Sequence, residues 1–375
     1  MASLSLKQSG SKVLSAGTAS MTIVRGTDAG FDTTVTTTST ILLVTSRATG
    51  TPVYINWELT DGNTITVART DTTGNITVFW VLLSFSSGVV VQHKSISLSA
   101  LQTTNTAAIN AASIGGGRWI VSGGVNPGNG NANRSFGRLV FDSSTQISAT
   151  RLTADNSDSA VYKCQVVEYD NATVQTVSGT LSSSTATTDD KTITAVTTAK
   201  TAIWGTMSAD GGNPDAIFWD AFLTSTTNLR LQRTTGTSLS FNYTVYVVEF
   251  TGSESVQANA VAQADGVGTS NLTITAVDTA LAVAMLTGVS PIGMSTGRSG
   301  SGVSEYERHS ASSDLTSTTN HQVVRAEANN AQDYHSQVIE FSEAAAAAST
   351  SDAGVRNGSD FTTFVLKRIV RRYAG

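Results

Sequence analysis

The chain is poor in cysteine, in charge and in long apolar runs, and each shortage excludes a class of protein. Cys164 is the single cysteine among 375 residues, so no disulfide forms within the chain. Its seat in the apolar run VYKCQVV favours a buried small residue over a nucleophile. Only 14% of residues are charged, and a net charge of −5 gives no reason to expect a nucleic-acid partner.

The N-terminal segment has no apolar stretch long enough for a secretory signal or a membrane span. We therefore predict synthesis in a cytoplasm, without export by a cleaved signal and without a membrane partner.

Helical periodicity is also scarce, whereas short runs of β-branched and aromatic residues are frequent. Four such runs are bounded by Asn, Asp, Gly or Ser and predict strands: ITVFWVLLSF, AVYKCQVVEY, YTVYVVEF and SQVIEF. Hydrophobic residues make up 39% of the chain, enough for a folded core. The sequence thus predicts an all-β protein.

One segment recurs four times. VYVVEFTGSESVQ (245–257) is similar to CQVVEYDNATVQ (164–175), and WVLLSFSSGVVVQ (80–92) and QVIEF (337–341) fit the same frame. The residues in register, which we call the marker residues, are spaced by 81 to 91 positions: Ser84, Glu168, Glu249 and Glu340. A fixed period of this size indicates tandem domains.

The period predicts four β-sandwich repeats, Ig-like or jelly-roll-like, of about 81–91 residues each. Their expected bounds are 20–96, 97–180, 181–262 and 263–345. An N-terminal arm (1–19) and a C-terminal arm (346–375), the latter with the basic strand FVLKRIVRRYAG, flank them. We expect both arms to bind adjacent subunits of a homo-oligomer.

An arginine precedes each marker residue by 15 to 17 positions, at Arg69, Arg151, Arg233 and Arg325. Both faces of the marker strands are apolar, so a glutamate there needs a partner. The arginine across the hairpin is the economical candidate, which predicts three structural ion pairs: Arg151 with Glu168, Arg233 with Glu249, and Arg325 with Glu340. The first repeat has Ser84 instead, so this pairing is not obligatory.

No catalytic, cofactor or metal motif stands out. Three similar copies of a lone carboxylate do not provide a general acid and a general base with different pKa values. His309, His321 and His335 lack metal-ligand spacing. The glycine-rich segment 115–134 lacks the lysine and following helix of a phosphate loop and reads as a long surface loop. We predict no catalytic residues, no cofactor and no metal.

Tryptophans supply the remaining candidates for binding. Trp57 and Trp219 each lie five residues after a proline, and Trp119 lies within the glycine-rich segment. Exposed indoles at these three positions could stack on sugar rings, although recurrence at strand positions favours packing in a core.

The succession of a VVEF-type strand, a VQ, a Thr/Ser/Ala stretch and an ITAV-type strand resembles repeats of uncharacterised virion proteins of tailed bacteriophages. The resemblance covers roughly 20–342 and is clearest over 160–290. It implies a component of the particle, a fibre or decoration of the tail, neck or capsid surface. It transfers no functional residues to this chain.

Three functions remain open at this point. The leading one is a non-enzymatic virion protein whose four sandwiches form a rod or a curved shell element. The second is an adhesin that binds a host glycan. The third, least favoured, is a polysaccharide-cleaving enzyme whose spaced carboxylates are hidden by the fold.

Overall fold

A computed structural model describes residues 1–49, 54–70, 72–127, 136–152, 159–182, 187–209, 219–233, 240–289, 295–296, 298–299, 310–326, 328 and 331–342. Within these ranges the regular structure is antiparallel β-strand, apart from two 3-10 turns at Thr37–Ser39 and Thr198–Lys200. The all-β prediction is confirmed. Met1–Ala344 form one compact body, and the predicted C-terminal arm, 346–375, lies outside the described residues.

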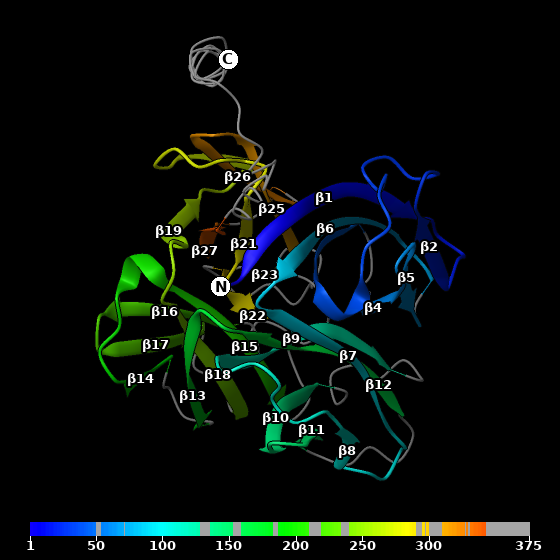
Figure 1. Ribbon diagram of the computed structural model, residues 1–375. Helices are drawn as coiled ribbons and strands as arrows, with labels where there is room; N and C mark the ends of the chain where they lie inside the picture. The colour runs from blue at the N-terminus through cyan, green and yellow to red at the C-terminus, as the bar shows by residue number, and fades with distance from the viewer. Residues whose placement is uncertain are drawn as a thin grey trace, which may run out of the picture. The chain divides into compact units, whose positions relative to one another are not determined.

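The strands fall into four successive sets, which we call modules 1 to 4 (Figure 1). Module 1 contains β1 (Ser3–Leu14), β2 (Ser20–Val24), β3 (Thr40–Thr49), β4 (Ile55–Asp61), β5 (Thr64–Arg69) and β6 (Asn75–Ser87). Module 2 contains β7 (Val89–Leu98), β8 (Thr104–Ala108), β9 (Gly117–Pro127), β10 (Gly137–Ser143), β11 (Gln146–Arg151) and β12 (Ala160–Tyr169).

Module 3 contains β13 (Ala172–Leu181), β14 (Thr188–Thr192), β15 (Thr201–Ala209), β16 (Trp219–Ser225), β17 (Asn228–Arg233) and β18 (Phe241–Phe250). Module 4 contains β19 (Ser255–Gln263), β20 (Thr269–Thr273), β21 (Ala282–Leu286), β22 (Gly288–Val289), β23 (Ser295–Thr296), β24 (Arg298–Ser299), β25 (Ser310–Ser317), β26 (Asn320–Arg325) and β27 (Gln332–Glu340).

Every module contains two antiparallel sets of paired strands with one strand order, and the pairing of β4 with β9 joins one set of module 1 and one of module 2 into a six-stranded sheet. In the first set the last strand lies between the first and the third: β1-β6-β3, β7-β12-β9, β13-β18-β15 and β19-β27-β21. In the second set the penultimate strand lies between the second and the fourth main strand: β2-β5-β4, β8-β11-β10, β14-β17-β16 and β20-β26-β25. The repeat in the sequence is therefore a repeat in strand pairing.

The modules begin one strand earlier than the predicted repeats. The segment predicted as an N-terminal arm, 1–19, contains β1, which pairs with β6 from Ser3 opposite Ser87 to Leu14 opposite Ile76. It is a strand of module 1 and not an arm free to bind a neighbouring subunit. The predicted ranges 20–96, 97–180 and 181–262 each end within the first strand of the next module. The first strand of a module pairs with its last, a long-range pairing that a local pattern does not reveal.

The modules close on one another instead of forming an open row. The fourth strand of each module contacts the third-strand segment of the next: β4 with β9, β10 with β15, and β16 with β22. The series is completed by β25 of module 4, which contacts β3 of module 1. Beside this junction the backbone N–H of Leu4 donates to the carbonyl of Ser342 at 2.8 Å. The four modules thus form a closed series around a common axis, which differs from a rod, one of the two arrangements expected from the repeats.

The buried side chains follow this closure. One continuous hydrophobic cluster runs through modules 1, 2 and 3 and takes in Val256, Val283, Ile339 and Phe341 of module 4. Two smaller clusters complete the interior of module 4. The modules share a core along the axis, so they are not independent beads.

Candidate functional site

The recurring arginine is a buried clamp on a loop. Arg69, Arg151, Arg233 and Arg325 end β5, β11, β17 and β26, and their exposed fractions are 0% to 3%. Each guanidinium donates to backbone carbonyls of the loop that joins the first two strands of its own module. The acceptors are Ser15 (2.6 Å) and Thr18 (2.8 Å) in module 1, Ser99 (2.8 Å) and Ala100 (2.7 Å) in module 2, Ser182 (2.9 Å) in module 3 and Ala264 (2.8 Å) in module 4.

The recurring glutamine holds the next loop, between the second and third strands. The side-chain amide of Gln175 donates to the carbonyl of Thr194 at 2.9 Å, and the N–H of Thr194 donates back to Gln175 Oε1 at 2.7 Å. The same two-way bond recurs in the other modules: Gln8 with Thr33, Gln92 with Asn110 and Gln257 with Thr275.

The recurring glutamates hold that same loop. Glu249 accepts the backbone N–H of Thr197 at 2.7 Å, and Glu340 accepts that of Asp278 at 2.7 Å. In module 2 Glu168 accepts the N–H of Ser113 at 2.9 Å. The glutamates therefore satisfy backbone donors that a loop would otherwise leave unpaired.

These contacts replace the predicted ion pairs. Arg151 lies at the end of β11, whereas Glu168 lies eight residues along β12, opposite Arg118. The cation beside Glu168 is Arg118, with Nε 3.3 Å from Oε1. The same division holds in modules 3 and 4. There the arginine binds the loop between the first two strands and the glutamate binds the loop between the second and third strands, for Arg233 and Glu249 and for Arg325 and Glu340. Spacing in a hairpin does not tell which end of the following strand lies near the arginine.

The residue after each marker packs on the common axis. Ring centroids are 5.7 Å apart for Phe85–Tyr169, 5.3 Å for Tyr169–Phe250, 6.0 Å for Phe250–Phe341 and 5.4 Å for Phe341–Phe85. These four rings, which we call the aromatic hub, form a closed circuit through all modules and are at most 5% exposed. Each such pair contributes about 0.5–1.5 kcal/mol beyond its buried area. The aromatic recurs in the sequence, but nothing there shows that its four copies meet.

A buried carboxylate lies against the hub. Tyr169 donates its phenolic O–H to Glu254 at 2.9 Å, and Ser342 donates to the same oxygen at 2.8 Å. Burial, and then the neighbouring Glu254, raise the pKa of Tyr169 well above its usual range. The phenol is thus a fixed hydrogen-bond donor and not a titrating group at neutral pH.

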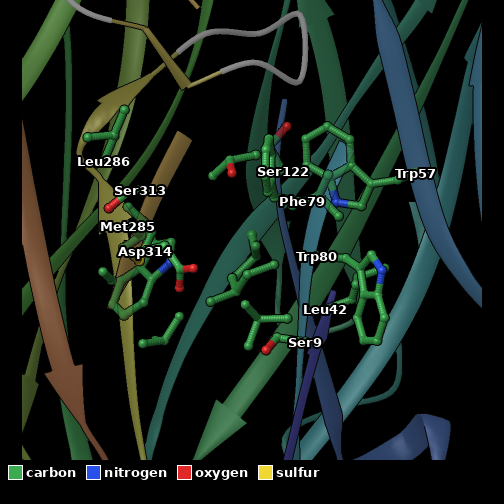
Figure 2. A pocket seen from close by; sticks show the side chains of 18 of the residues that line it. Ser9, Leu42, Trp57, Phe79, Trp80, Ser122, Met285, Leu286, Ser313 and Asp314 are labelled. Carbon is green, nitrogen blue, oxygen red and sulfur yellow. The ribbon is translucent and has the colours of Figure 1, made fainter. Parts of the chain in front are cut away.

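A cavity of about 330 Å³ lies beyond the hub along the axis. Equivalent positions of the four third strands line it, namely Leu43, Val121, Trp204 and Met285. Figure 2 shows its two main walls, with Ser9, Leu42, Trp57 and Trp80 of module 1 facing Met285, Leu286, Ser313 and Asp314 of module 4.

The three candidate stacking tryptophans are buried, with exposed fractions of 6% for Trp57 and 1% for Trp119 and Trp219. Trp119 packs on Trp204 at 5.1 Å between ring centroids. Trp57 alone of the three lines the cavity. Trp219 lies opposite Arg233, and the residue at the same position in module 1, opposite Arg69, is Ile55. Trp57 and Trp219 are therefore not equivalent, although both lie five residues after a proline.

The remaining predicted features have structural roles. His321 lies 2.8 Å from the hydroxyl of Ser313, and burial lowers its pKa to about 4. His335 stacks on Phe222 at 3.7 Å and contacts Asp220, and His309 lies outside the described residues. In the part of the chain that is described, no three His, Cys, Asp or Glu gather as a metal site, and no helix has the length and apolarity to span a membrane.

The glycine-rich segment 115–134, predicted as a surface loop, is a strand over most of its described part, because β9 spans Gly117–Pro127. Gly123 shows why glycine is needed there. A Cβ at that position would lie 2.8 Å from the carbonyl of Trp57 and 2.9 Å from the Cβ of Lys163. The glycine lets modules 1 and 2 approach closely.

Burial raises the pKa of the Cys164 thiol to about 12, in line with a packing residue. Comparison with known proteins finds no protein-family model and no curated protein that matches the chain.

Proposed function

We propose that the chain is a non-enzymatic structural component of a tailed-bacteriophage virion, a fibre or decoration protein of the tail, neck or capsid surface. The observation that carries the proposal is the use of the recurring residues. Arginine, glutamine and glutamate bind backbone loops, and the aromatic that follows each marker packs in the hub. In an enzyme, such polar residues converge on a cleft with a nucleophile, acid or base in reach of substrate. Here they are committed to holding the scaffold.

We infer further that the two sheets of a module face each other as a jelly-roll-like sandwich. Pairing of the first strand with the last, and of the second with the penultimate, is the wrapping order of a jelly roll. Alternating burial along β5, β17 and β26 supports it, since each buries every second residue.

The proposal includes synthesis in a host cytoplasm and assembly of the chain into a homo-oligomer. The homo-oligomer then binds other virion proteins. Its support is the set of outer edge strands. β8, β14 and β20 each lie at the end of their sheet and alternate exposed with half-buried residues. Unpaired edges rich in threonine can pair with a neighbouring chain.

Mass photometry of the purified full-length chain tests this function. We expect one defined oligomer, which Thr269→Lys together with Thr273→Lys dissociates by placing charge on the β20 edge. Thr318→Lys, in the exposed turn between β25 and β26, is the matched control and should leave the oligomer intact. A wild-type chain that stays monomeric at micromolar concentration contradicts the proposal.

A further inference from the structure

The four junctions between modules differ at one position of the last strand. Gln165 of module 2 reaches into module 1, where its amide donates to the carbonyl of Leu42 at 2.6 Å and accepts the N–H of Leu42 at 2.8 Å. Gln337 of module 4 does the same to Ile203 of module 3, at 3.0 and 2.9 Å. Tyr246 of module 3 donates to the carbonyl of Leu139 in module 2 at 3.3 Å. Three junctions are therefore filled by a long polar side chain.

Val81 holds this position in module 1. The register shows the equivalence, because Val81 lies opposite Leu43 as Gln165 lies opposite Val121 and Gln337 lies opposite Met285. The short side chain of Val81 cannot reach the backbone of Ala284 in module 4, and both residues line the cavity. The space that glutamine or tyrosine fills elsewhere stays open between modules 4 and 1.

The walls of this space are rich in aromatic surface. The indole N–H groups of Trp57, Trp80 and Trp204 are buried without a hydrogen-bond partner in the structure, and so is the hydroxyl of Thr287. All four residues line the cavity. These four residues are at most 8% exposed. Trp119 and Trp219, which lie outside the lining, share an unpaired N–H, so what the cavity itself adds is the aromatic surface of its indoles.

The mouth of the cavity supplies a hydrogen-bond acceptor. Ser9 and Asp314 line it and are exposed, so the site is open to solvent on that side. Figure 2 shows Asp314 and Ser313 across from Ser9 and Leu42. A carboxylate accepts hydrogen bonds only, and it repels anionic ligands.

We propose that this cavity binds a pyranose ring, such as the terminal sugar of a surface glycan. The C–H faces of a pyranose pack on aromatic side chains, while its hydroxyls can donate to Asp314 at the mouth. A wholly apolar ligand would make no hydrogen bond to Asp314. The volume of about 330 Å³ lies at the lower end of the range for small-ligand pockets, which suits one or two sugar rings. This activity goes beyond the structural role and does not depend on it.

The test uses the full-length chain and a panel of methyl glycosides of glucose, galactose, mannose, rhamnose and N-acetylglucosamine. Saturation-transfer NMR identifies which glycoside binds, and calorimetry measures its Kd. We expect saturable binding of at least one glycoside.

Val81→Gln is the decisive variant. We expect the new amide to bind the backbone of Ala284 as Gln165 and Gln337 bind theirs, to fill the cavity and to weaken glycoside binding at least tenfold while the melting temperature is kept. Asp314→Asn removes the negative charge at the mouth and replaces one of the two acceptor oxygens by an N–H donor, so it should weaken binding about tenfold without loss of folding. Asp32→Asn, an exposed carboxylate outside the cavity lining, is the control and should leave Kd unchanged.

Three results would overturn the proposal. One is the lack of saturable binding for all five glycosides at concentrations up to about 50 mM. Another is unchanged affinity in Asp314→Asn and in a folded Val81→Gln. The third is binding of phenol or indole, used as apolar probes, in the absence of any glycoside binding.

Discussion

At the scale of single residues, the polar positions that recur are explained by backbone groups. A loop that leaves a sheet exposes carbonyl and N–H groups without strand partners, and these need side-chain partners when buried. A guanidinium offers five donors and suits a cluster of carbonyls, whereas a primary amide can serve one carbonyl and one N–H together. Arg233 and Gln175 divide these tasks in module 3 as their equivalents do elsewhere.

The arginine clamp gives a sharp expectation in module 3. Arg233→Met keeps much of the side-chain volume but leaves the carbonyl of Ser182 without this donor, so the free energy of unfolding should fall by about 2–4 kcal/mol. Arg230→Met is the matched control on the same strand, because Arg230 is an exposed partner of Asp190 at 2.7 Å. Urea denaturation measures both variants, and equal losses would show that the clamp contributes nothing special.

At the scale of elements, the strands could be predicted from the sequence but their pairing could not. VYVVEF, AVYKCQVVEY and ITVFWVLLSF lie in β18, β12 and β6 as expected. Their β-branched and aromatic content acts locally and is visible in a short window. Pairing of β6 with β1 joins residues more than 60 positions apart, and no local pattern carries that information.

The residues that line the cavity could likewise be predicted only in part from the sequence. Trp57 was selected from the sequence, but as an exposed stacking residue and not as part of a buried wall. Val81, Trp204 and Asp314 were not selected, because their meeting depends on closure of module 4 against module 1. A comparison of the four marker strands does offer one signal, since Val81 stands where the others have Gln165, Tyr246 and Gln337.

The role of β1 distinguishes a strand from an arm. Deletion of residues 1–14 removes one of the two partner strands of β6, together with the buried side chains of Leu4 and Leu14, so we expect loss of the near-ultraviolet dichroism of packed aromatics and of a cooperative thermal transition. An assembly arm would behave differently. A deletion variant that melts like the wild type but changes only its oligomeric state would restore the interpretation of 1–19 as an arm.

At the scale of the whole compact body, Met1–Ala344, similar modules are joined by dissimilar contacts. Lys163 binds Glu58 at 2.6 Å between modules 2 and 1, whereas the equivalent His335 stacks on Phe222 between modules 4 and 3. Distinct pairs at equivalent junctions favour one order of modules over the alternatives. The repeat thus provides a common scaffold, and the departures from it give each junction its own chemistry.

Closure of module 4 on module 1 is the central claim, and the hub pair Phe85 and Phe341 reports on it most directly. Their rings lie 5.4 Å apart although 256 positions separate them in the chain.

A double-mutant cycle with Phe85→Leu and Phe341→Leu, read by urea denaturation, measures their coupling. We expect about 0.5–1.5 kcal/mol, against no coupling in the control cycle of Phe341 with Phe31, which packs on Trp80 within module 1. Coupling that is zero for both pairs would contradict a closed series of modules.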